Sequence, residues 1–242
     1  MKISVIVPAY NEERLLGQTL LQLQQAMTAF SRAAWDAELI VCDNNSTDRT
    51  AGIAQASGAR VVFEPINQIG RARNSGAAVA SGDWLIFVDA DSHPSVNLFE
   101  EVIEEIRAGH SLAGGCTIKL DGEDRGLAAF VANSWNWLSR RFRLLAGSFI
   151  FCETTAFRTV GGFNNELFAS EELDLTKRLK RLARASGKRI VVLHRNPIVT
   201  SGRKLHLYTH RELLWFVTRT IFTGGGTLKR RESCAAWYDG RR

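Results

Sequence analysis

Two aspartates separated by one alanine, Asp89 and Asp91, directly follow an apolar run at 84–88. In an extended chain, side chains two residues apart point to the same side, so these carboxylates would repel each other. A divalent cation would relieve the repulsion, because Mg²⁺ and Mn²⁺ prefer oxygen ligands and often complete their coordination with water and substrate phosphates. The spacing therefore favours a metal site. The alternative is a helix start, with Asp91 or Ser92 capping a helix near Ser95.

The two aspartates end the last of four strands that alternate with helices in the first half of the sequence. Strands are expected at 3–8, 37–43, 59–64 and 83–91, and helices at 12–30, 46–58, 69–82 and 95–109. Continuously apolar strands joined by helices are typical of a parallel sheet covered on both faces. Ligands of such sheets bind beyond the carboxyl ends of the strands, which places 8–11, 43–48 and 89–91 along one rim.

The second half of the sequence is less regular. Residues 148–163 are expected to form a strand, a short helix and a Gly-Gly turn. Further strands are expected at 111–120 and 188–194, one or two helices over 125–147, and helices at 170–187 and 210–222. No linker is apparent, so we expect one domain, 1–242, made of two lobes.

The formal net charge of the chain is +6, and residues 203–242 account for all of it, with nine Lys or Arg against three Asp or Glu. A neutral body with a basic tail indicates an anionic neighbour such as a membrane surface, phosphates or nucleic acid, although a solvated tail is the alternative. Nucleic acid is the weakest of these, because the basic residues gather in a tail and no known binding motif is present.

The location of the protein is indicated by its cysteines and its apolar runs. Its four cysteines show no CxxC spacing, which excludes that metal or redox motif and agrees with a reducing cytoplasm. The short apolar run at the N-terminus predicts a first strand rather than a signal peptide, and no run approaches the roughly 20 residues that cross a bilayer. Any membrane contact is therefore expected to be peripheral, at the inner face.

Two segments, 133–147 and 210–231, combine aromatic and basic residues. They suit an anionic membrane surface, or they are core-packed helices with basic solvent faces.

Four segments resemble motifs of the family-2 glycosyltransferases with the GT-A fold, in the order in which that family has them. "VIVPAYNEE" (5–13) is similar to the opening strand and turn, and "IVCDNNSTDRT" (40–50) to the second strand end. "IGRARNSGAAVASGDWLIFVDADS" (69–92) resembles the segment that runs into a DxD motif, and "GGFNNELFASEELDLTKRL" (161–179) a Gly-Gly-Phe turn followed by an acidic helix start. The resemblance extends along residues 1–200.

The resemblance implies an α/β fold with a mostly parallel, Rossmann-like central sheet flanked by helices. A smaller acceptor-side lobe and, here, a basic C-terminal helical extension would complete it. Within the single domain we expect a nucleotide-binding half at 1–110, an acceptor-side half at 111–202 and the extension at 203–242.

The resemblance also implies a nucleotide-diphosphate sugar as donor, Mn²⁺ or Mg²⁺ as cofactor, and transfer with inversion. Asp89 matches the first DxD carboxylate, near the ribose or the metal, and Asp91 the main metal ligand. Asp43 matches the residue that binds the base, and a carboxylate can accept the imide N–H of uracil or guanine. An Asx turn is its alternative role. Other matches are with the nucleoside turn (Pro8, Tyr10, Glu12) and with the segment lining the donor site (Arg71, Arg73, Asn74).

An arginine in that lining segment can pair bidentately with phosphate. For Arg71 a solvated helix face is the alternative. Late in the chain, GT-A enzymes often draw another metal or phosphate contact from the region after a strand. His194 is the first candidate for this contact and His206 the second. Arg203 and Lys204 are expected to clamp the diphosphate.

Inversion in one step needs a carboxylate that takes the proton of the acceptor hydroxyl. The family has a Glu-Asp pair at the start of the helix after the Gly-Gly-Phe turn, where this sequence has Glu171 and Glu172, with Asp174 behind. Glu172 aligns with the usual aspartate but is one methylene longer, which leaves the base open among the three. Acids in a first helical turn also offset the helix dipole.

The resulting hypothesis is a metal-dependent inverting glycosyltransferase, hexosyltransferase-like, with a UDP- or GDP-linked donor. The sequence leaves the acceptor open, with a lipid-linked molecule or a glycan as candidates. The alternatives are a non-catalytic nucleotide-sugar or membrane-surface module of the same fold and a nucleotidyltransferase. The latter usually has a glycine-rich basic loop after its first strand, where this chain has "PAYNEE".

Overall fold

The computed structural model describes residues 1–122, 126–202 and 228 of the chain. The strands are β1 (Lys2–Ala9), β2 (Asp36–Asp43), β3 (Arg60–Phe63), β4 (Trp84–Val88), β5 (Ser92–His93), β6 (Ser111–Leu120), β7 (Phe149–Glu153) and β8 (Arg189–Thr200). The helices are α1 (Leu16–Arg32), α2 (Thr50–Ala56), α3 (Ile69–Val79), α4 (Val96–Ala108), α5 (Gly126–Phe142), α6 (Thr154–Thr159) and α7 (Glu171–Ala185).

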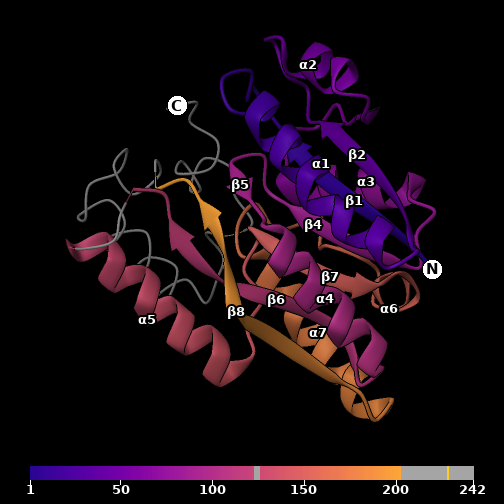
Figure 1. The fold of residues 1–242 in the computed structure, drawn as a ribbon, viewed down its shortest axis with the longest axis vertical. Coiled ribbons are helices and arrows are strands. Elements are labelled where there is room, and N and C mark those ends of the chain that lie inside the picture. Colours follow the sequence, from indigo (N-terminus) through magenta and orange to yellow (C-terminus); the bar gives the residue numbers. More distant parts are fainter. Residues whose placement is uncertain (123–125, 203–227, 229–242) are drawn as a thin grey trace.

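One sheet in the order β3-β2-β1-β4-β7-β6-β8-β5 runs through this part of the chain (Figure 1). The first four strands of this order are parallel to one another, as predicted for the first half of the sequence. β7 is antiparallel to both of its neighbours, β4 and β6, whereas β6 and β8 are parallel. The carboxyl ends of β1, β2 and β4 therefore meet at one edge, where the candidate site lies.

Helices cover both faces of this sheet. In β1, Ile3, Val5 and Val7 belong to a buried apolar cluster with α1 and α4, whereas Ile6 belongs to a second cluster with α3, α6 and α7. This alternation follows from the two-residue period of a strand, and it explains why β1 is apolar almost throughout. Gly76 lets α3 approach β1 closely, because a Cβ there would lie 2.5 Å from Ile6 Cγ2.

The strand before the two aspartates is shorter than predicted. β4 ends at Val88, and Ser92 N donates to Asp89 O at 3.0 Å, so residues 89–92 form a turn. The expectation that Asp89 and Asp91 project together from an extended strand is therefore wrong. The chain then forms β5, which pairs antiparallel with β8.

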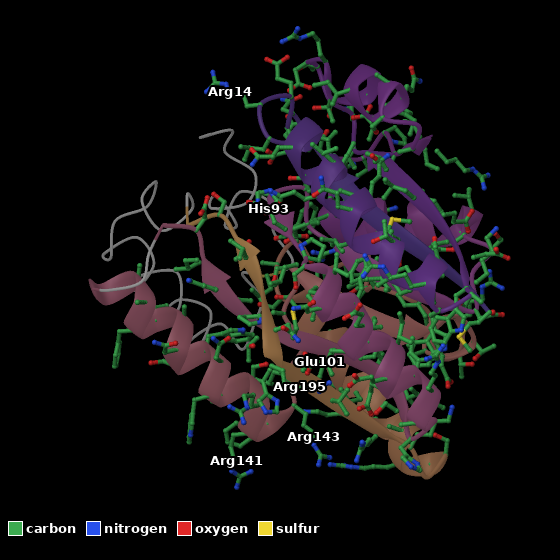
Figure 2. All side chains as sticks on the ribbon, in the orientation of Figure 1. Arg14, His93, Glu101, Arg141, Arg143 and Arg195 are labelled. Atoms are coloured by element: carbon green, nitrogen blue, oxygen red, sulfur yellow. The ribbon has the colours of Figure 1, made fainter. Side chains whose placement is uncertain are left out.

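β8 is longer than the predicted strand at 188–194 and continues through Pro197. Because proline cannot donate to the ladder, its pairing with β6 is irregular at this point. Glu101 of α4 compensates, since its carboxylate accepts from the backbone N–H groups of His194 and Asn196 at 3.3 and 3.2 Å. Figure 2 shows Glu101 next to Arg195, with which it also forms an ion pair at 3.4 Å.

The segment predicted to hold one or two helices forms one, α5, and the predicted helix at 210–222 lies outside the described residues. Within the described part of the chain, no helix combines the length and apolar character needed to cross a bilayer.

Candidate functional site

The turns that follow β1 and β2 are joined by hydrogen bonds into one rim. Asn44 N donates to Ala9 O at 2.8 Å, and Asn11 N donates to Ser46 Oγ at 2.9 Å. Thr47 N in turn donates to Asn11 Oδ1 at 2.8 Å. Asn11 adopts a left-handed backbone conformation with φ of 49°, which asparagine tolerates better than most residues. The two turns therefore lie side by side, as the parallel strand order predicts.

Asp43 ends β2 at this rim and is 6% exposed. Its Oδ1 accepts from Ser46 N, three residues further on, at 3.2 Å, so the carboxylate also holds the turn that follows β2. Binding of a base by Asp43 stays a prediction. Asp48 forms an Asx turn just before α2, since its carboxylate accepts from Thr50 N at 2.9 Å, and it also accepts from Glu13 N at 3.1 Å. Burial opposes ionisation of Asp48, but these hydrogen bonds hold its pKa below the usual value.

The predicted nucleoside-binding residues lie on the same rim. Pro8 is buried within β1, and Tyr10 and Glu12 are half-buried in the turn that follows. Glu12 N donates to Thr50 Oγ1 at 2.8 Å, and Glu12 O accepts from Leu16 N at 2.9 Å. The backbone of Glu12 thus fixes the turn to α1 and α2, and contact of these three residues with a nucleoside stays a prediction.

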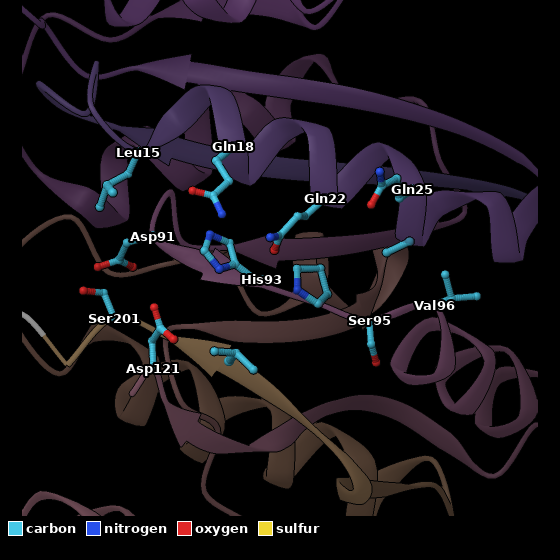
Figure 3. A pocket seen from close by; sticks show the side chains of 13 residues that line it. Leu15, Gln18, Gln22, Gln25, Asp91, His93, Ser95, Val96, Asp121 and Ser201 are labelled. Atoms are coloured by element: carbon cyan, nitrogen blue, oxygen red, sulfur yellow. The ribbon is translucent and has the colours of Figure 1, made fainter. Parts of the chain in front are cut away.

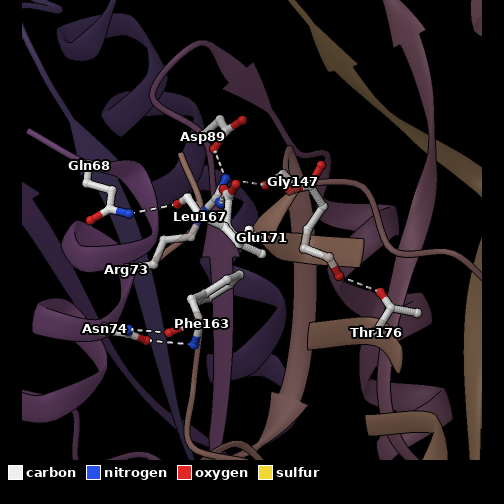
Figure 4. Close-up of polar contacts among 10 residues, drawn as sticks. Gln68, Arg73, Asn74, Asp89, Gly147, Phe163, Leu167, Glu171 and Thr176 are labelled. Atoms are coloured by element: carbon white, nitrogen blue, oxygen red, sulfur yellow. Dashed lines mark hydrogen bonds and ion pairs between the residues drawn. The ribbon is translucent and has the colours of Figure 1, made fainter. Parts of the chain in front are cut away.

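A buried arginine connects the first DxD aspartate to the acidic start of α7. Arg73 Nη2 donates to Asp89 Oδ1 at 2.8 Å, and Arg73 Nη1 donates to Glu171 Oε1 at 2.6 Å (Figure 4). Nη2 also donates to Gly147 O at 3.1 Å. The Arg73 and Glu171 side chains are only 2% and 4% exposed. A phosphate would therefore have to displace one of the carboxylates to pair with Arg73 as the sequence predicts.

The Gly-Gly-Phe turn packs against this arginine through Phe163. The guanidinium of Arg73 lies 5.2 Å from the ring centroid of Phe163, which is a cation–π contact. Asn74 Nδ2 donates to Phe163 O at 2.8 Å, and Phe163 N donates to Asn74 Oδ1 at 2.9 Å. Gly161 and Gly162 both have positive φ, which glycine adopts without strain. Asn74 thus positions the turn, and its predicted contact with the donor stays a prediction.

Arg71 lies in the first turn of α3 and is half-buried. Its Nε donates to Gln68 Oε1 at 2.7 Å, while Gln68 Nε2 donates to Asn165 O and Leu167 O at 2.8 and 2.7 Å. Gln68 therefore ties α3 to the loop before α7. Through Gln68, the Arg71 side chain is linked to this loop, so it is not freely solvated, and its contact with the donor stays a prediction.

The three acids at the start of α7 have different surroundings. Glu171 is paired with Arg73, and Asp174 is paired with Arg178 at 2.7 Å. Glu172 is half-buried. Burial, and then the charge of Glu171, raises the pKa of Glu172 to about 8, against an opposing effect of Arg73. The carboxyl group of Glu172 thus has a pKa near neutral pH.

Asp91 lies in a separate pocket of about 520 Å³ between α1, β5 and the end of β8 (Figure 3). Gln18, Gln22 and Gln25 of α1 line one wall, and His93, Asp121 and Ser201 also contribute. His93 Nε2 lies 3.2 Å from Thr19 Oγ1. Sequence reasoning missed His93 and Asp121. The spacing of His93, two residues after Asp91, is the signal that was available.

The histidine that the sequence favoured as a further metal contact lies elsewhere. Thr200 of β8 pairs with Ser92, which follows Asp91, whereas His194 precedes Thr200 by six residues, about 20 Å along an extended strand. The side chain of His194 lines a groove against α5. His194 is therefore separated from the two aspartates, and its predicted role as a metal ligand is wrong. Arg203, Lys204 and His206 lie outside the described residues.

Asp89 and Asp91 both lie in the turn that follows β4 at this edge, and carboxylates have the chemistry to hold a hard cation. Among the described residues, no group of three or more His, Cys, Asp or Glu side chains converges as a metal site. A cation on Asp89 and Asp91 would therefore take most of its ligands from water and phosphate oxygens, as Mg²⁺ commonly does with one or two protein carboxylates. The carboxylate donors thus fit such an ion.

Solved structures share the fold of this chain. Staphylococcus aureus TarS, residues 1–349, matches with a TM-score of 0.65 at 23% identity, covering 99% of this chain and 78% of that one. The mannosyltransferase PcManGT from Pyrobaculum calidifontis, solved with GDP-Man and Mn²⁺, matches with a TM-score of 0.67 at 17% identity, covering 90% of this chain and 60% of that one. The sheet and helices described above are therefore those of the GT-A fold.

Curated relatives match the first part of the sequence. An uncharacterized glycosyltransferase of Mycobacterium tuberculosis is 31% identical over 138 residues, which are 57% of this chain and 54% of that protein. The dolichol-phosphate mannosyltransferase of Pyrococcus furiosus is 30% identical over 123 residues, 48% of this chain and 33% of that protein. The chain spans about half the length or less of these curated relatives.

The family model described as glycosyl transferase family 2 matches residues 4–158, which include both rim turns, Arg73 and the two aspartates. This match covers more than half of the chain. The order of the four motifs, the GT-A sheet and the family match agree, and the chain belongs to glycosyl transferase family 2.

Proposed function

We propose that the chain transfers a sugar, with inversion, from a nucleotide-diphosphate donor to an acceptor hydroxyl. The observation that carries the proposal is the arrangement around Arg73, which holds Asp89 of the DxD turn and Glu171 of the acidic helix on one guanidinium. The residues for the diphosphate and the residues for proton transfer are thereby fixed relative to each other. Such fixed geometry is what a displacement reaction requires, because the reacting groups must meet in one orientation.

Glu172 is the general base in this proposal. It takes the proton of the acceptor hydroxyl as the hydroxyl oxygen bonds to the anomeric carbon and the bond to the diphosphate breaks. Its raised pKa supports this role, since a base is most effective when its pKa lies near the working pH. Glu171 and Asp174 already neutralise Arg73 and Arg178, so we assign them to positioning.

The donor is a UDP- or GDP-linked sugar in this proposal. Asp43 binds the base, the turn of Pro8, Tyr10 and Glu12 contacts the nucleoside, and Arg71 reaches the diphosphate. Support comes from solved relatives of the fold, since TarS was solved with UDP-GlcNAc and PcManGT with GDP-Man. Residues 1–110 would form the nucleotide-binding half and residues 111–202 the acceptor-side half.

Asp91 and Asp89 would hold Mg²⁺ or Mn²⁺, which neutralises charge on the departing diphosphate when bound. PcManGT was solved with Mn²⁺, and a Mycobacterium tuberculosis glucosyl-3-phosphoglycerate synthase with Mg²⁺ and UDP. We further infer a cytoplasmic location with a peripheral contact to an anionic membrane surface. A lipid-linked acceptor would be compatible with that location, as would a soluble glycan.

The test is a thermal-shift screen of UDP- and GDP-sugars, each with and without Mn²⁺, followed by hydrolysis of the sugar that binds. We expect one donor class to raise Tm only when metal is present, and the same donor to be split slowly by water. Donor binding without any hydrolysis or transfer would favour the non-catalytic module. Absence of stabilisation by every nucleotide-sugar would contradict the proposal.

A further inference from the structure

The side of helix α5 that packs against the sheet carries small and polar side chains. Ala132 and Ser139 are buried, and they share one side of the helix with Asn136. Asn136 Oδ1 accepts from Ile118 N at 2.9 Å and Asn136 Nδ2 donates to Ile118 O at 2.8 Å, so the amide pairs with β6 as a neighbouring strand would. Figure 1 shows α5 beside β6 and β8 at the margin of the molecule.

The opposite side of α5 carries the large apolar side chains. Phe130 and Trp137 are 67% and 66% exposed, Phe142 is 49% exposed, and Val131 and Leu138 are exposed between them. A surface helix of a globular protein normally buries such residues and exposes its polar ones. The amphipathic pattern of α5 is thus reversed, and an exposed apolar patch of this kind marks an interaction surface.

Positive charge gathers at one end of this patch. Arg140, Arg141 and Arg143 are exposed at the carboxyl end of α5, and the sequence has no Asp or Glu between Gly126 and Cys152. Figure 2 shows Arg141 and Arg143 pointing away from the sheet at that end. Arginines next to exposed aromatic side chains are complementary to the surface of an anionic bilayer. There the aromatic rings can enter the boundary between headgroups and acyl chains, and the arginines can contact the anionic headgroups.

The area of the patch favours a bilayer over a protein partner. At their exposed fractions, Phe130, Trp137 and Phe142 together offer about 300–450 Å², taking 150–250 Å² for a whole aromatic side chain. Even with Val131 and Leu138 added, this is below the roughly 800 Å² that each partner buries in a stable protein interface. A bilayer needs no matching surface on a partner, and aromatic side chains are enriched at its interface.

We propose that α5 is the membrane-binding surface of this protein, with its aromatic side in the headgroup region and its three arginines on anionic lipid phosphates. The inference rests on the membrane contact proposed above, but it is independent of the transfer reaction. The helix lies on the acceptor-side half, so membrane binding through α5 would bring that half of the site next to the lipid surface.

Vesicle co-sedimentation of the full chain tests this inference. Vesicles of phosphatidylcholine with 30% phosphatidylglycerol are compared with vesicles of phosphatidylcholine alone, and we expect strong binding to the anionic ones, weakened by salt. The triple variant Arg140→Gln, Arg141→Gln, Arg143→Gln should lower the partition coefficient about 100-fold, or about fivefold for each arginine. The double variant Phe130→Ala, Trp137→Ala should lower it at least tenfold.

Two controls match these variants outside α5. The triple variant Arg158→Gln, Arg181→Gln, Arg184→Gln removes the same charge from exposed positions on α6 and α7. Phe63→Ala removes an aromatic side chain that is 60% exposed at the end of β3. Both controls should bind vesicles nearly as the unchanged chain does. Equal loss in the charge control would show that binding follows net charge and overturn the assignment to α5.

Two further outcomes overturn the inference. One is undiminished vesicle binding by both α5 variants, which would leave the basic segment 203–242 to carry it. The other is a dimer that the Phe130→Ala, Trp137→Ala variant abolishes, seen by light scattering, without vesicle binding by the unchanged chain. The thermal shift given by a nucleotide-sugar is measured on the same samples. Retained donor binding separates failure of this inference from failure of the proposed transferase function.

Discussion

Asp89 and Glu171 accept hydrogen bonds from the two terminal nitrogens of the same guanidinium, that of Arg73, at 2.8 and 2.6 Å. One carboxylate follows β4 and the other begins α7, so Arg73 joins two parts of the chain that are 82 positions apart. The charges of the two carboxylates outweigh the effect of burial and raise the pKa of Arg73. The arginine therefore remains a cation in the protein interior, with a partner on each side.

Replacing this arginine should strongly destabilise the fold. Arg73→Met leaves Asp89 and Glu171 without their cation, and breaking a buried ion pair costs about 3–5 kcal/mol. For a chain of this size we expect Tm to fall by roughly 10 °C in a thermal denaturation experiment. Arg32→Met is the matched control, because its pair with Glu100 is exposed and such pairs contribute about 0–1 kcal/mol.

A double variant tests whether charge is the cause. In Arg73→Met, Glu171→Gln the partner on α7 is neutral, so the double variant should be more stable than Arg73→Met alone. The explanation is wrong if adding Glu171→Gln lowers the stability further, or if Arg73→Met is as stable as Arg32→Met.

Glu172→Gln should remove transfer while leaving donor binding intact. The amide has the shape of the carboxylate but cannot take a proton, and loss of a general base typically slows a reaction about 10²–10⁴-fold. The rate is measured as hydrolysis of the nucleotide-sugar found in the thermal-shift screen, and binding as the shift itself. Asp174→Asn, on the same helix and paired with Arg178, should change the rate far less. The assignment fails if Asp174→Asn or Glu171→Gln abolishes hydrolysis and Glu172→Gln does not.

The rate of the unchanged chain should increase with pH up to about 8. Burial and the charge of Glu171 raise the pKa of Glu172 to about 8, so below this pH most molecules carry a protonated, inactive base. The plot of log kcat/KM against pH should rise with unit slope and level off near that value, since kcat/KM reports ionisation in the free enzyme. A profile that is flat from pH 5 to 9 would rule out a base with this pKa.

The same carboxyl group should make stability depend on pH. Because its pKa in the folded chain lies above that in the unfolded chain, the folded chain holds a proton that the unfolded chain loses between about pH 4.5 and 8. The contribution of Glu172 to stability therefore falls as pH rises through this window. Glu172→Gln does not titrate, so its Tm relative to the unchanged chain should increase from pH 5 to 8, measured without metal or nucleotide. A constant difference would contradict the raised pKa.

The sequence predicted the parallel half of the sheet and the positions of the motifs because these follow from local patterns. Apolar strands alternate with amphipathic helices, and parallel order brings the ends of β1, β2 and β4 to one edge. The same local patterns predicted that the strand at 188–194 ends at His194, and on that basis His194 was wrongly assigned to the metal. Asn196 and Pro197 have the composition of a loop, yet β8 continues past them because Glu101 satisfies the backbone donors there.

The role of Arg73 could not be predicted from local patterns either. Its place in the segment that resembles a donor-site lining indicated a contact with phosphate, whereas its two carboxylate partners depend on the folded position of α7 and on the turn after Val88. The turn itself replaces the extended strand that the apolar run predicted. Long-range ion pairs of this kind require the positions of elements that are far apart in sequence.

Asp91→Asn should abolish the effect of metal on donor binding. Asp91 offers its carboxylate to a pocket at the carboxyl edge of the sheet, and an amide is a much weaker ligand for Mg²⁺ or Mn²⁺ than a carboxylate. Titration calorimetry with the nucleotide-sugar, in Mn²⁺ and in chelator, should show affinity in Mn²⁺ falling to the level found in chelator. Asp36→Asn, exposed at the opposite end of β2, keeps the same net charge as Asp91→Asn and should bind as the unchanged chain does. If Asp91→Asn retains metal-enhanced binding, the cation is held elsewhere and the metal assignment is wrong.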